Sequence, residues 1–499
     1  MKFVFDRIFL CCCVVHILFM KELNIKIMDI DKKANFSEWY DEALKESEIL
    51  DSRYNSKGMF IWLPYGFKIM RRIKEMWDKL FQDAGIQECY FPQLVPIEYA
   101  EQNKSWWEGF KEEGYLMVTG KNKEVQGIIR PTGEPAIYPM YKLWIRTFSD
   151  LPLRLYQTTS SFRYESKSTR PLIRDREITM WHEIHTAHAT KEEAEKEVDL
   201  HIKLWDKLWD KLALPVWKVR KPQWECFAGA VGAIEYYTLF PSARVMETGS
   251  VNNLGQAYAK EFDIKFKDTD EKEHFVWQVC TGVGARLLAA IISIHGDRKG
   301  IIVPPEIAPT KCVIVPIMFK GKEQIILKKA KEIESMLKKE NISVFIDSRD
   351  EIAAGRKFYE WEAKGIPLRI EIGPRDLEKN QITIVRRDSN EKVAINESKV
   401  IEKVRELLDN IQKSLLKEAE HELKKSIVDV ITFHDIKKAI KNKKVARVFW
   451  CKSRDCYDIF GGIGDGIEGI GTDLDEKTNG KCIVCGKETK ARLFIGKSY

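Results

Sequence analysis

One stretch, from Phe162 to His188, constrains the fold and chemistry of this chain more than any other. It reads FRYESKSTRPLIRDREITMWHEIHTAH, which predicts a strand, a basic loop and a returning strand that carries several ring side chains. Trp181, Glu183 and His185 alternate along the second strand, so they share one of its faces. The alternative interpretation of the basic residues is a β-hairpin on a solvated surface.

Matching segments on both sides turn this stretch into a family resemblance. Phe162–Glu165 fits the F-R-x-E start of the second signature motif of class II aminoacyl-tRNA synthetases, and Gly282–Arg286 before an apolar helix fits the third. A helix followed by YFPQLVP, with Pro92, fits the first motif, which builds the dimer interface of the class. Thr169–Arg174 and Glu183–His188 resemble one family in particular, the prolyl-tRNA synthetases of archaeal and eukaryotic type.

The resemblance covers about residues 36–499 and implies a ligase. Such an enzyme activates proline with ATP and Mg²⁺ to prolyl-adenylate, then transfers the prolyl group to tRNA(Pro). The attacking carboxylate is already ionised, so the work is positioning and charge neutralisation. Two alternatives stay open: a paralogous class II ligase for another small amino acid, and a tRNA-binding regulator without catalysis. Because the motif residues Arg163, Glu165 and Arg286 are all present, the sequence argues against a regulator that has lost catalysis.

The resemblance also assigns a nucleotide site. The planar guanidinium of Arg163 would hold α-phosphate and carboxylate oxygens together, and Glu165 would accept from the adenine amino group. Arg174 would meet the outer phosphates, and Arg286 would stack on adenine while facing the γ-phosphate. Arg163 and Arg286 are the expected catalytic residues. The expected ATP-binding residues are Arg163, Glu165, Arg174, Glu247, Ser250 and Arg286.

The same resemblance assigns an amino-acid pocket. Proline presents a secondary ammonium, whose two N–H groups the hydroxyl of Thr132 and the carboxylate of Glu134 can satisfy. The side chains of Trp181 and His185 would line two sides of the pyrrolidine ring, and Glu183 would orient the bound proline. The expected proline-binding residues are Thr132, Glu134, Arg163, Trp181, Glu183, His185 and Asn252.

The pocket segments depart from the family pattern at several positions. The family has Ser where Gly133 stands, Gln at Glu247, Thr at Ser250 and His at Asn252. These changes leave the fine shape and charge of the pocket open. For the segment around Pro131 and Gly133, a simple turn is the alternative.

Length and composition fit a large soluble enzyme. A chain of 499 residues predicts about three domains, and 44% apolar with 31% charged residues describes a globular chain with a core. The net charge of +7 permits a nucleic-acid partner without indicating one. We expect a mixed α/β and α+β architecture: an N-terminal extension (1–35), a class II antiparallel-sheet catalytic domain (36–303), an α/β anticodon-binding domain (304–410) and a small zinc-bearing α+β domain (411–499).

In the expected anticodon-binding domain, the resemblance points to four base-reading residues. Arginines and carboxylates suit guanine and cytosine edges, which a single-stranded loop exposes. The expected residues are Glu362, Arg369, Arg375 and Asp376. Ordinary surface ion pairs are the alternative for each of them.

Four of the eleven cysteines stand in two close pairs near the end of the chain. A C-x₄-C pair and a C-x₂-C pair together predict a closed, tetrahedral structural zinc site, with free thiols or iron as the alternatives. The expected ligands are Cys451, Cys456, Cys482 and Cys485. The Gly-rich residues 461–471 between the pairs lack the context of a phosphate-binding motif, and we expect a loop.

The two ends of the chain carry separate expectations. Residues 1–20 are apolar, but the uncharged part is too short to span a bilayer and no small-residue cleavage site follows. We expect translation to start at Met20 or Met28; a membrane anchor is the alternative. The resemblance implies a homodimer and a C-terminus, Tyr499, that reaches toward the catalytic domain. The cysteine pattern shows no disulfide ladder, so we expect a reducing, cytoplasmic compartment and no membrane partner.

Overall fold

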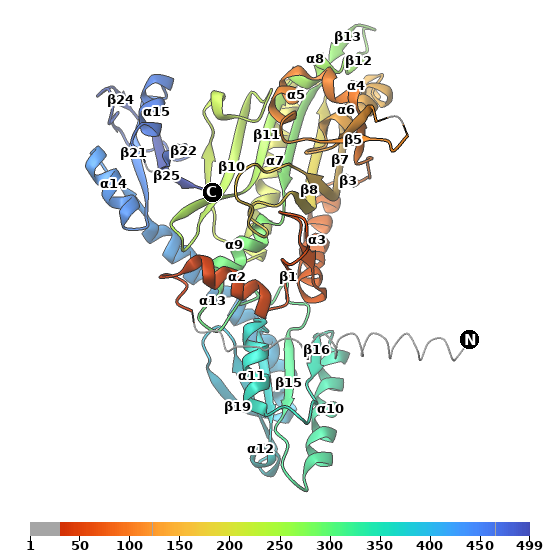
Figure 1. Cartoon of the computed structure of the whole chain (residues 1–499), viewed down its shortest axis with the longest axis vertical. Helices are drawn as coiled ribbons and strands as arrows, with labels where there is room; N and C mark the ends of the chain where they lie inside the picture. Colours follow the sequence, from red (N-terminus) through yellow and green to blue (C-terminus); the bar gives the residue numbers. More distant parts are fainter. Residues whose placement is uncertain (1–29, 122, 465) are drawn as a thin grey trace.

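A computed structural model of the chain describes residues 30–121, 123–464 and 466–499 (Figure 1). The expectations for the apolar residues 1–20 and for a start at Met20 or Met28 lie outside these residues. Within the described part, no helix is both long and apolar enough to cross a membrane.

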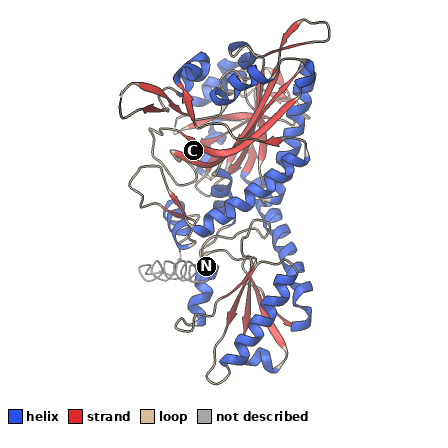
Figure 2. Cartoon of the chain, turned by 90° about the vertical axis from the view of Figure 1, so that its right-hand side faces the viewer, coloured by secondary structure: helices blue, strands red, loops and turns tan. Residues whose placement is uncertain are grey.

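A long, mostly antiparallel sheet, here called the central sheet, lies in the upper part of the molecule in Figures 1 and 2. Neighbouring pairs β10–β11, β11–β14, β14–β8 and β8–β7 are antiparallel, as expected for a class II core. In spatial order the strands are β20 (Ile427–Asp429), β21 (Val445–Phe449), β25 (Arg492–Ser498), β22 (Ile467–Asp473), β9 (Trp217–Arg220), β10 (Gly232–Leu239), β11 (Arg244–Gly255), β14 (Trp277–Val283), β8 (Glu177–His188), β7 (Leu153–Phe162) and β3 (Gln87–Glu88).

Amphipathic helices contribute to the apolar core at this sheet. Three of the helices are α3 (Pro64–Asp83), α7 (Lys191–Lys211) and α9 (Arg286–His295), and their buried residues join the largest core cluster. Helix α7 begins with a capping box between Thr190 and Glu193, which satisfies two N–H groups at its start. They match closely the helices that the sequence predicts over residues 65–85, 190–213 and 287–297.

The sequence FSEWYDEALKESEILDSRY predicts an amphipathic helix over residues 36–54, but the helix in the structure is shorter. Helix α2 (Phe36–Glu46) ends because the hydroxyl of Ser47 bonds back to the carbonyl of Ala43 and Glu48 takes a positive φ of 56°. The chain then forms a small hairpin of β1 (Leu50–Asp51) and β2 (Ile61–Trp62).

A smaller sheet and several helices lie at one end of the central sheet. Its order is β4 (Leu94–Pro96), β6 (Val125–Ile129) and β5 (Tyr115–Val118). The segment YFPQLVP predicts a strand over residues 90–96, and only its last three residues form one. The neighbouring elements are α4 (Ile97–Gln102), α5 (Lys104–Phe110), α6 (Glu134–Trp144), α8 (Ala257–Glu261), β12 (Lys265–Lys267) and β13 (Glu273–Phe275).

The next part of the chain is the expected α/β unit, which lies at the lower end of the molecule in Figure 1. Strand β15 pairs in parallel with β16 and β17, and β18 and β19 follow antiparallel beyond β17. The elements are β15 (Cys312–Pro316), α10 (Glu323–Lys339), β16 (Val344–Ile346), α11 (Ala354–Ala363), β17 (Leu368–Ile372), α12 (Pro374–Glu378), β18 (Gln381–Arg386) and β19 (Lys392–Asn396).

The C-terminal part is built into the central sheet. Helix α13 (Val400–Ser426) leads to it and runs without interruption through residue 410, where we expected a domain boundary. Strand β22 pairs with β9, and β25 pairs with β11, so strands from the end of the chain continue the sheet of the expected catalytic domain. The remaining elements are α14 (Phe433–Lys441), α15 (Arg454–Gly461), β23 (Gly480–Lys481) and β24 (Glu488–Thr489).

The Gly-rich segment differs from its prediction as a loop, because Ile467–Asp473 forms strand β22. Its glycines permit close packing: a Cβ on Gly469 would lie 2.5 Å from the ring of Tyr457, and one on Gly471 would lie 2.5 Å from Val219. Gly469 and Gly471 therefore serve strand packing.

Candidate active site

A cavity of about 300 Å³ lies against strands β8, β11 and β14. Its wall also includes the start of α6 and the loop that follows β7. The structure brings all the predicted ATP-binding and proline-binding residues to this one cavity: Thr132, Glu134, Arg163, Glu165, Arg174, Trp181, Glu183, His185, Glu247, Ser250, Asn252 and Arg286.

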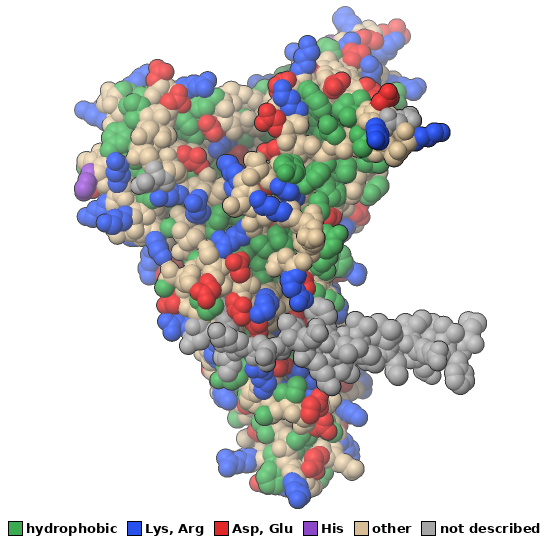
Figure 3. Space-filling view, in the orientation of Figure 1, with side chains coloured by type: hydrophobic (Ala, Val, Ile, Leu, Met, Phe, Trp, Pro, Cys, Tyr) green, Lys and Arg blue, Asp and Glu red, His purple; other side chains and the backbone are tan. Residues whose placement is uncertain are grey.

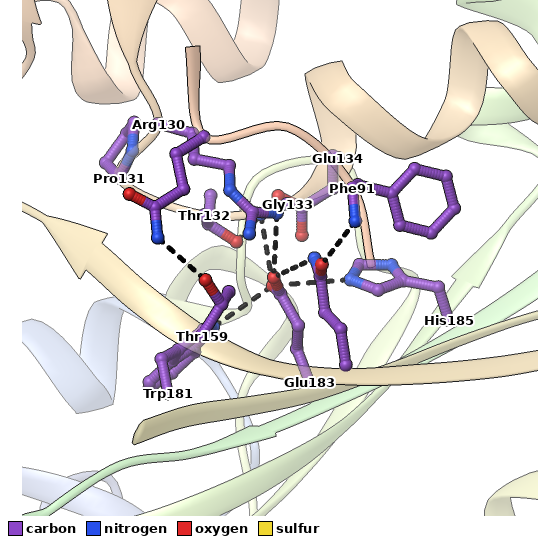
Figure 4. Close-up of polar contacts among 12 residues, drawn as sticks. Phe91, Arg130, Pro131, Thr132, Gly133, Glu134, Thr159, Trp181, Glu183 and His185 are labelled. Carbon is purple, nitrogen blue, oxygen red and sulfur yellow. Dashed lines mark hydrogen bonds and ion pairs between the residues drawn. The ribbon is translucent and has the colours of Figure 1, made fainter. Parts of the chain in front are cut away.

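The carboxylate of Glu183 is the centre of the polar contacts beneath the cavity (Figure 4). One oxygen accepts from Gln157 at 2.7 Å and lies 3.3 Å from Arg130 Nη1. The other accepts from Trp181 Nε1 at 3.0 Å and lies 3.4 Å from His185 Nε2. Burial alone would raise the pKa of Glu183, but the hydrogen bond from His185 and the charge of Arg130 outweigh it and lower the pKa to about 2. Glu183 is therefore ionised and fixed in place.

Gly133, where the family has Ser, lies directly against this carboxylate. Its N–H donates to Glu183 Oε2 at 3.0 Å. A Cβ at this position would lie 2.6 Å from Glu183 Oε1 and 2.8 Å from Ile137 Cδ1, closer than van der Waals contact allows. The departure at Gly133 therefore makes room for the position that Glu183 occupies.

A second buried carboxylate, Glu134, begins helix α6 and faces the cavity. Thr132 Oγ1 donates to Glu134 Oε2 at 2.7 Å, and both side chains are buried. Burial raises the pKa of Glu134, and nearby His185 partly opposes that rise. His185 is held by Tyr138, whose hydroxyl lies 2.9 Å from Nδ1. A small cation entering the pocket would find a carboxylate and a hydroxyl side by side.

The guanidinium of Arg163 lies between two aromatic rings, 5.5 Å from the centroid of Phe110 and 5.5 Å from that of Trp181. Its Nε donates to the carbonyl of Pro131 at 3.2 Å. Loss of water in this setting lowers the pKa of Arg163, and the positive charge of Arg286 adds to the effect. The flat group is thus held with its orientation set by stacking.

Gly282 and Gly284 of the expected third motif provide the space for the ring of Trp181. A Cβ on Gly282 would lie 2.6 Å from that ring, and one on Gly284 would lie 3.1 Å from it. Glycines in this motif are expected to let the strand approach a nucleotide closely, because they carry no side chain. In the structure, an aromatic side chain of the neighbouring strand β8 fills that space.

The remaining predicted ATP residues form two ion pairs. Arg286 Nη1 lies 3.4 Å from Glu247 Oε2, so the negative charge that this chain has in place of the family's Gln is balanced. Arg286 Nε also donates to the carbonyl of Ile173 at 3.0 Å. Arg174 Nε lies 3.7 Å from Glu165 Oε2. Farther along β11, Asn252 Nδ2 donates to Ser250 Oγ at 3.2 Å.

Several residues of the cavity wall were missed by sequence reasoning. Glu235 lies on β10, and burial raises its pKa to about 7, with the charge of Glu247 adding to the rise. Cys280, on β14, is buried beside the pocket. Neither residue has a local sequence signature, whereas Phe110 and Phe227 could have been suspected as aromatic residues near motif segments. Wall residues outside the predicted site include Phe110, Asp175, Phe227, Glu235 and Cys280.

The four predicted anticodon residues lie in different environments. Glu362 and Arg369 are buried, and their side chains form an ion pair at 2.8 Å, so they are not surface ion pairs. Arg369 also bonds Glu371 at 2.9 Å. Arg375, in α12, is exposed. Asp376 accepts from the N–H of Gly373 at 2.9 Å and so caps that helix.

The four predicted zinc ligands come together. Their sulfur atoms all lie within 4.8 Å of one another, and those of Cys451 and Cys485 are 3.7 Å apart. All four are free cysteines. Four thiols at this spacing fit a tetrahedral zinc ion. The group is Cys451, Cys456, Cys482 and Cys485.

The C-terminus reaches the catalytic sheet, as expected. Tyr499 N–H donates to the carbonyl of Val245 at 3.2 Å, and the Tyr499 hydroxyl lies 2.8 Å from Ser242 Oγ. A second cavity, of about 520 Å³, is lined by Tyr499 together with Arg174 and Arg286 of the first cavity. The two cavities therefore share wall residues.

Family models match three successive parts of the chain. Residues 115–295 match the tRNA synthetase class II core domain (G, H, P, S and T), residues 311–407 match the anticodon binding domain, and residues 433–499 match the prolyl-tRNA synthetase C-terminal domain.

Curated relatives and a solved structure span nearly the whole chain. A proline–tRNA ligase of Methanococcoides burtonii is 41% identical over 94% of this chain and 98% of its own length, and one of Methanocaldococcus jannaschii is 43% identical over 82% and 90%. The structure of Giardia lamblia prolyl-tRNA synthetase in complex with prolyl-adenylate matches with a TM-score of 0.91 and 32% identity, covering 95% of this chain and all of that one. The expected family and fold are thereby confirmed: the chain belongs to the prolyl-tRNA synthetases, within the class II aminoacyl-tRNA synthetases.

Proposed function

We propose that this chain is a proline–tRNA ligase that activates proline with ATP and transfers it to tRNA(Pro). The observation that carries the proposal is the single cavity in which a buried carboxylate–hydroxyl pair and several arginines face one another. Curated relatives of nearly equal length are ligases named for proline. They argue against the paralogous ligase and against the non-catalytic regulator.

Proline would bind at the buried end of the cavity. Its secondary ammonium has two N–H groups, which Glu134 and Thr132 accept. Its ring would lie between Trp181 and His185, both of which Glu183 holds. Its carboxylate would then point toward Arg163, because the ammonium is fixed at the opposite end.

ATP would bind along the more open side. Arg163 contacts both the proline carboxylate and the α-phosphate, so it stabilises the charge that develops as the carboxylate oxygen bonds to phosphorus and pyrophosphate leaves. Arg286 and Arg174 meet the outer phosphates, and Glu165 accepts from adenine. The 3.7 Å contact between Arg174 and Glu165 must open before Arg174 can reach a phosphate and Glu165 can reach the adenine amino group. Glu247 and Ser250 complete the nucleotide site.

Mg²⁺, when bound with ATP, neutralises phosphate charge. Glu235 and Glu247 line the cavity and offer the oxygen ligands that this ion prefers. In the second step, a terminal hydroxyl of the tRNA attacks the prolyl carbonyl of the adenylate, and AMP leaves. The proline then carries an ester bond to the tRNA.

The tRNA is recognised by the anticodon-binding domain. We assign base contacts to Glu362, Arg369, Arg375 and Asp376. Arg375 is exposed, so it is the residue that the RNA contacts first. Arg369 contacts a base only if it gives up part of its pairing with Glu362 and Glu371. The C-terminal cysteine cluster holds a structural zinc ion.

A homodimer and a cytoplasmic location complete the proposal. Exposed apolar side chains gather around α6 and the small β4–β6–β5 sheet, at the upper right of Figure 3. A concentration of exposed apolar surface marks an interaction site, and these elements adjoin the expected first motif. The exposed residues are Tyr90, Leu94, Leu116, Val118, Val125, Leu143 and Trp144.

The test is ATP–pyrophosphate exchange across a panel of amino acids, followed by aminoacylation of tRNA(Pro). We expect proline-dependent exchange with the highest kcat/KM for proline. Exchange with another amino acid but not with proline would replace the proposal by the paralogous ligase. Absence of exchange with every amino acid would favour the regulator.

A further inference from the structure

Three side chains with different metal-binding atoms meet at the buried end of the cavity. A carboxylate oxygen of Glu134, a ring nitrogen of His185 and the sulfur of Cys280 all lie within 4.8 Å of one another. Each side chain is buried, and each lines the cavity.

The three residues come from three separate elements. Glu134 is the first residue of α6, whereas His185 and Cys280 stand directly opposite each other on the paired strands β8 and β14. Directly opposed residues on antiparallel strands have Cβ atoms about 4.5–5.5 Å apart. The register of the sheet and the start of helix α6 thus determine how these three side chains lie relative to one another.

Thiolate, imidazole and carboxylate groups are the side-chain groups that commonly bind zinc in proteins. Sites with three protein ligands leave a fourth position for water or another small ligand. Both ring nitrogens of His185 have neighbours, Tyr138 at Nδ1 and Glu183 at Nε2. Whichever nitrogen binds a metal ion, the other keeps a polar contact that orients the ring.

The charge balance also suits a divalent ion. The Cys280 thiol would release its proton to solvent as the metal–sulfur bond forms, so the thiolate and the Glu134 carboxylate together carry two negative charges. Two arginines lie near these ligands: Arg130 is directed to Glu183, and Arg163 lies against Phe110 and Trp181 with its Nε bonded to Pro131. A bound Zn²⁺ would leave the ligand set neutral.

We propose that Zn²⁺ binds Glu134, His185 and Cys280 and blocks the amino-acid pocket. The ion occupies the place of the substrate ammonium, because both need the carboxylate of Glu134. Zinc is then a competitive inhibitor with respect to proline. This competition rests on the proposed function, whereas binding of the metal does not.

Metal binding is tested directly with Co²⁺, whose bond to a thiolate produces a charge-transfer absorption. The full-length enzyme first receives one equivalent of Zn²⁺ for its C-terminal cysteines, and Co²⁺ is then titrated. We expect an absorption band in the parent and in Cys312→Ala, which removes a buried cysteine of the anticodon-binding domain. The band should be absent in Cys280→Ser and in Cys280→Ala, and proline should diminish it in the parent.

Inhibition is tested by ATP–pyrophosphate exchange with added Zn²⁺. We expect zinc to raise the KM for proline without changing kcat, and Cys280→Ser to require at least roughly tenfold more zinc, since it loses a metal ligand. Thermal melts of both Cys280 variants check their folding.

The outcomes separate the two proposals. A Co²⁺ band unaffected by loss of Cys280, or inhibition that proline does not relieve, would overturn the zinc proposal. Failure of the proposed function would appear instead as absence of proline-dependent exchange before any extra zinc is added.

Discussion

The backbone N–H of Gly133 donates a hydrogen bond to Glu183 Oε2 at 3.0 Å, and a Cβ on the same residue would lie 2.6 Å from Oε1. One residue thus holds the central carboxylate of the pocket and leaves room for it. Any side chain at position 133 keeps the N–H but must push the carboxylate or Ile137 away.

Gly133→Ser restores the usual residue of the family and should nevertheless impair this enzyme. Glu183 is fixed by several donors, so its displacement disturbs Trp181 and His185 together. We expect kcat/KM for proline in pyrophosphate exchange to fall by roughly tenfold, since small misplacements in a preorganised site are costly. Gly232→Ala is a matched control, because its Cβ would meet no heavy atom of the described residues within 4 Å. Full activity of Gly133→Ser would show that the carboxylate is not constrained in this way.

Arg163→Ala should remove the group proposed to bridge proline and the α-phosphate. We expect the rate of adenylate formation to fall by about a hundredfold or more, as on loss of a preorganised charged donor. Arg72→Ala, on the exposed face of α3, should leave the rate unchanged. Near-parental exchange by Arg163→Ala would refute the assignment of the second motif.

Asn252→His should sharpen the choice of amino acid. Asn252 stands opposite Cys280 in the sheet and is smaller than the family's histidine, so one wall of the pocket is looser. Filling such a space changes discrimination by about 1–3 kcal/mol. We expect the kcat/KM ratio of proline over alanine and over cysteine to rise in Asn252→His and to fall in Asn252→Ala. Equal ratios in all three enzymes would mean that this wall does not select the substrate.

Stability should depend on pH through Glu183. Folding lowers its pKa from an ordinary value of 4.5 to about 2. A carboxyl with a depressed pKa stabilises the fold above its unfolded pKa, and this contribution is lost as pH falls through the folded pKa. The free energy of unfolding should therefore drop between about pH 5 and pH 2, by about 3 kcal/mol for this group.

Urea unfolding at a series of pH values measures this effect. Glu183→Gln should flatten the dependence in that window, whereas the exposed Glu75→Gln should retain the parental slope. A parental slope in Glu183→Gln would show that other carboxyls account for the acid sensitivity.

Cys482→Ser should release the proposed zinc ion. Metal analysis should find one zinc per chain in the parent and in Cys312→Ala, and much less in Cys482→Ser. Because β22 and β25 pair with β9 and β11, loosening of the C-terminal part should also lower pyrophosphate exchange. Unchanged exchange in a zinc-free variant would show that the shared sheet survives without the metal.

Local periodicity explains what the sequence could predict. The alternation of Trp181, Glu183 and His185 depends only on the two-residue repeat of a strand, and the paired cysteines depend only on spacing. Helix α2 was predicted too long because Ser47 and Glu48 end it through one hydroxyl contact and one backbone angle.

Contacts between distant segments explain the rest. Cys280 reaches His185 only through the register of β14 with β8, and no pattern around a lone cysteine reveals that register. Similarly, the burial of Arg369 depends on partners from α11 and from its own strand. The space that Gly282 leaves for Trp181 is visible only when the strands are placed side by side.

Strand β25, the last seven residues before Tyr499, lies between β21 and β22 and pairs with the start of β11. Arg244 pairs with Lys497 in this contact, so the sheet beside the cavity joins segments that lie far apart in the chain. Bringing such distant strands together costs loop-closure entropy before their hydrogen bonds form. This edge of the sheet should therefore form late in folding.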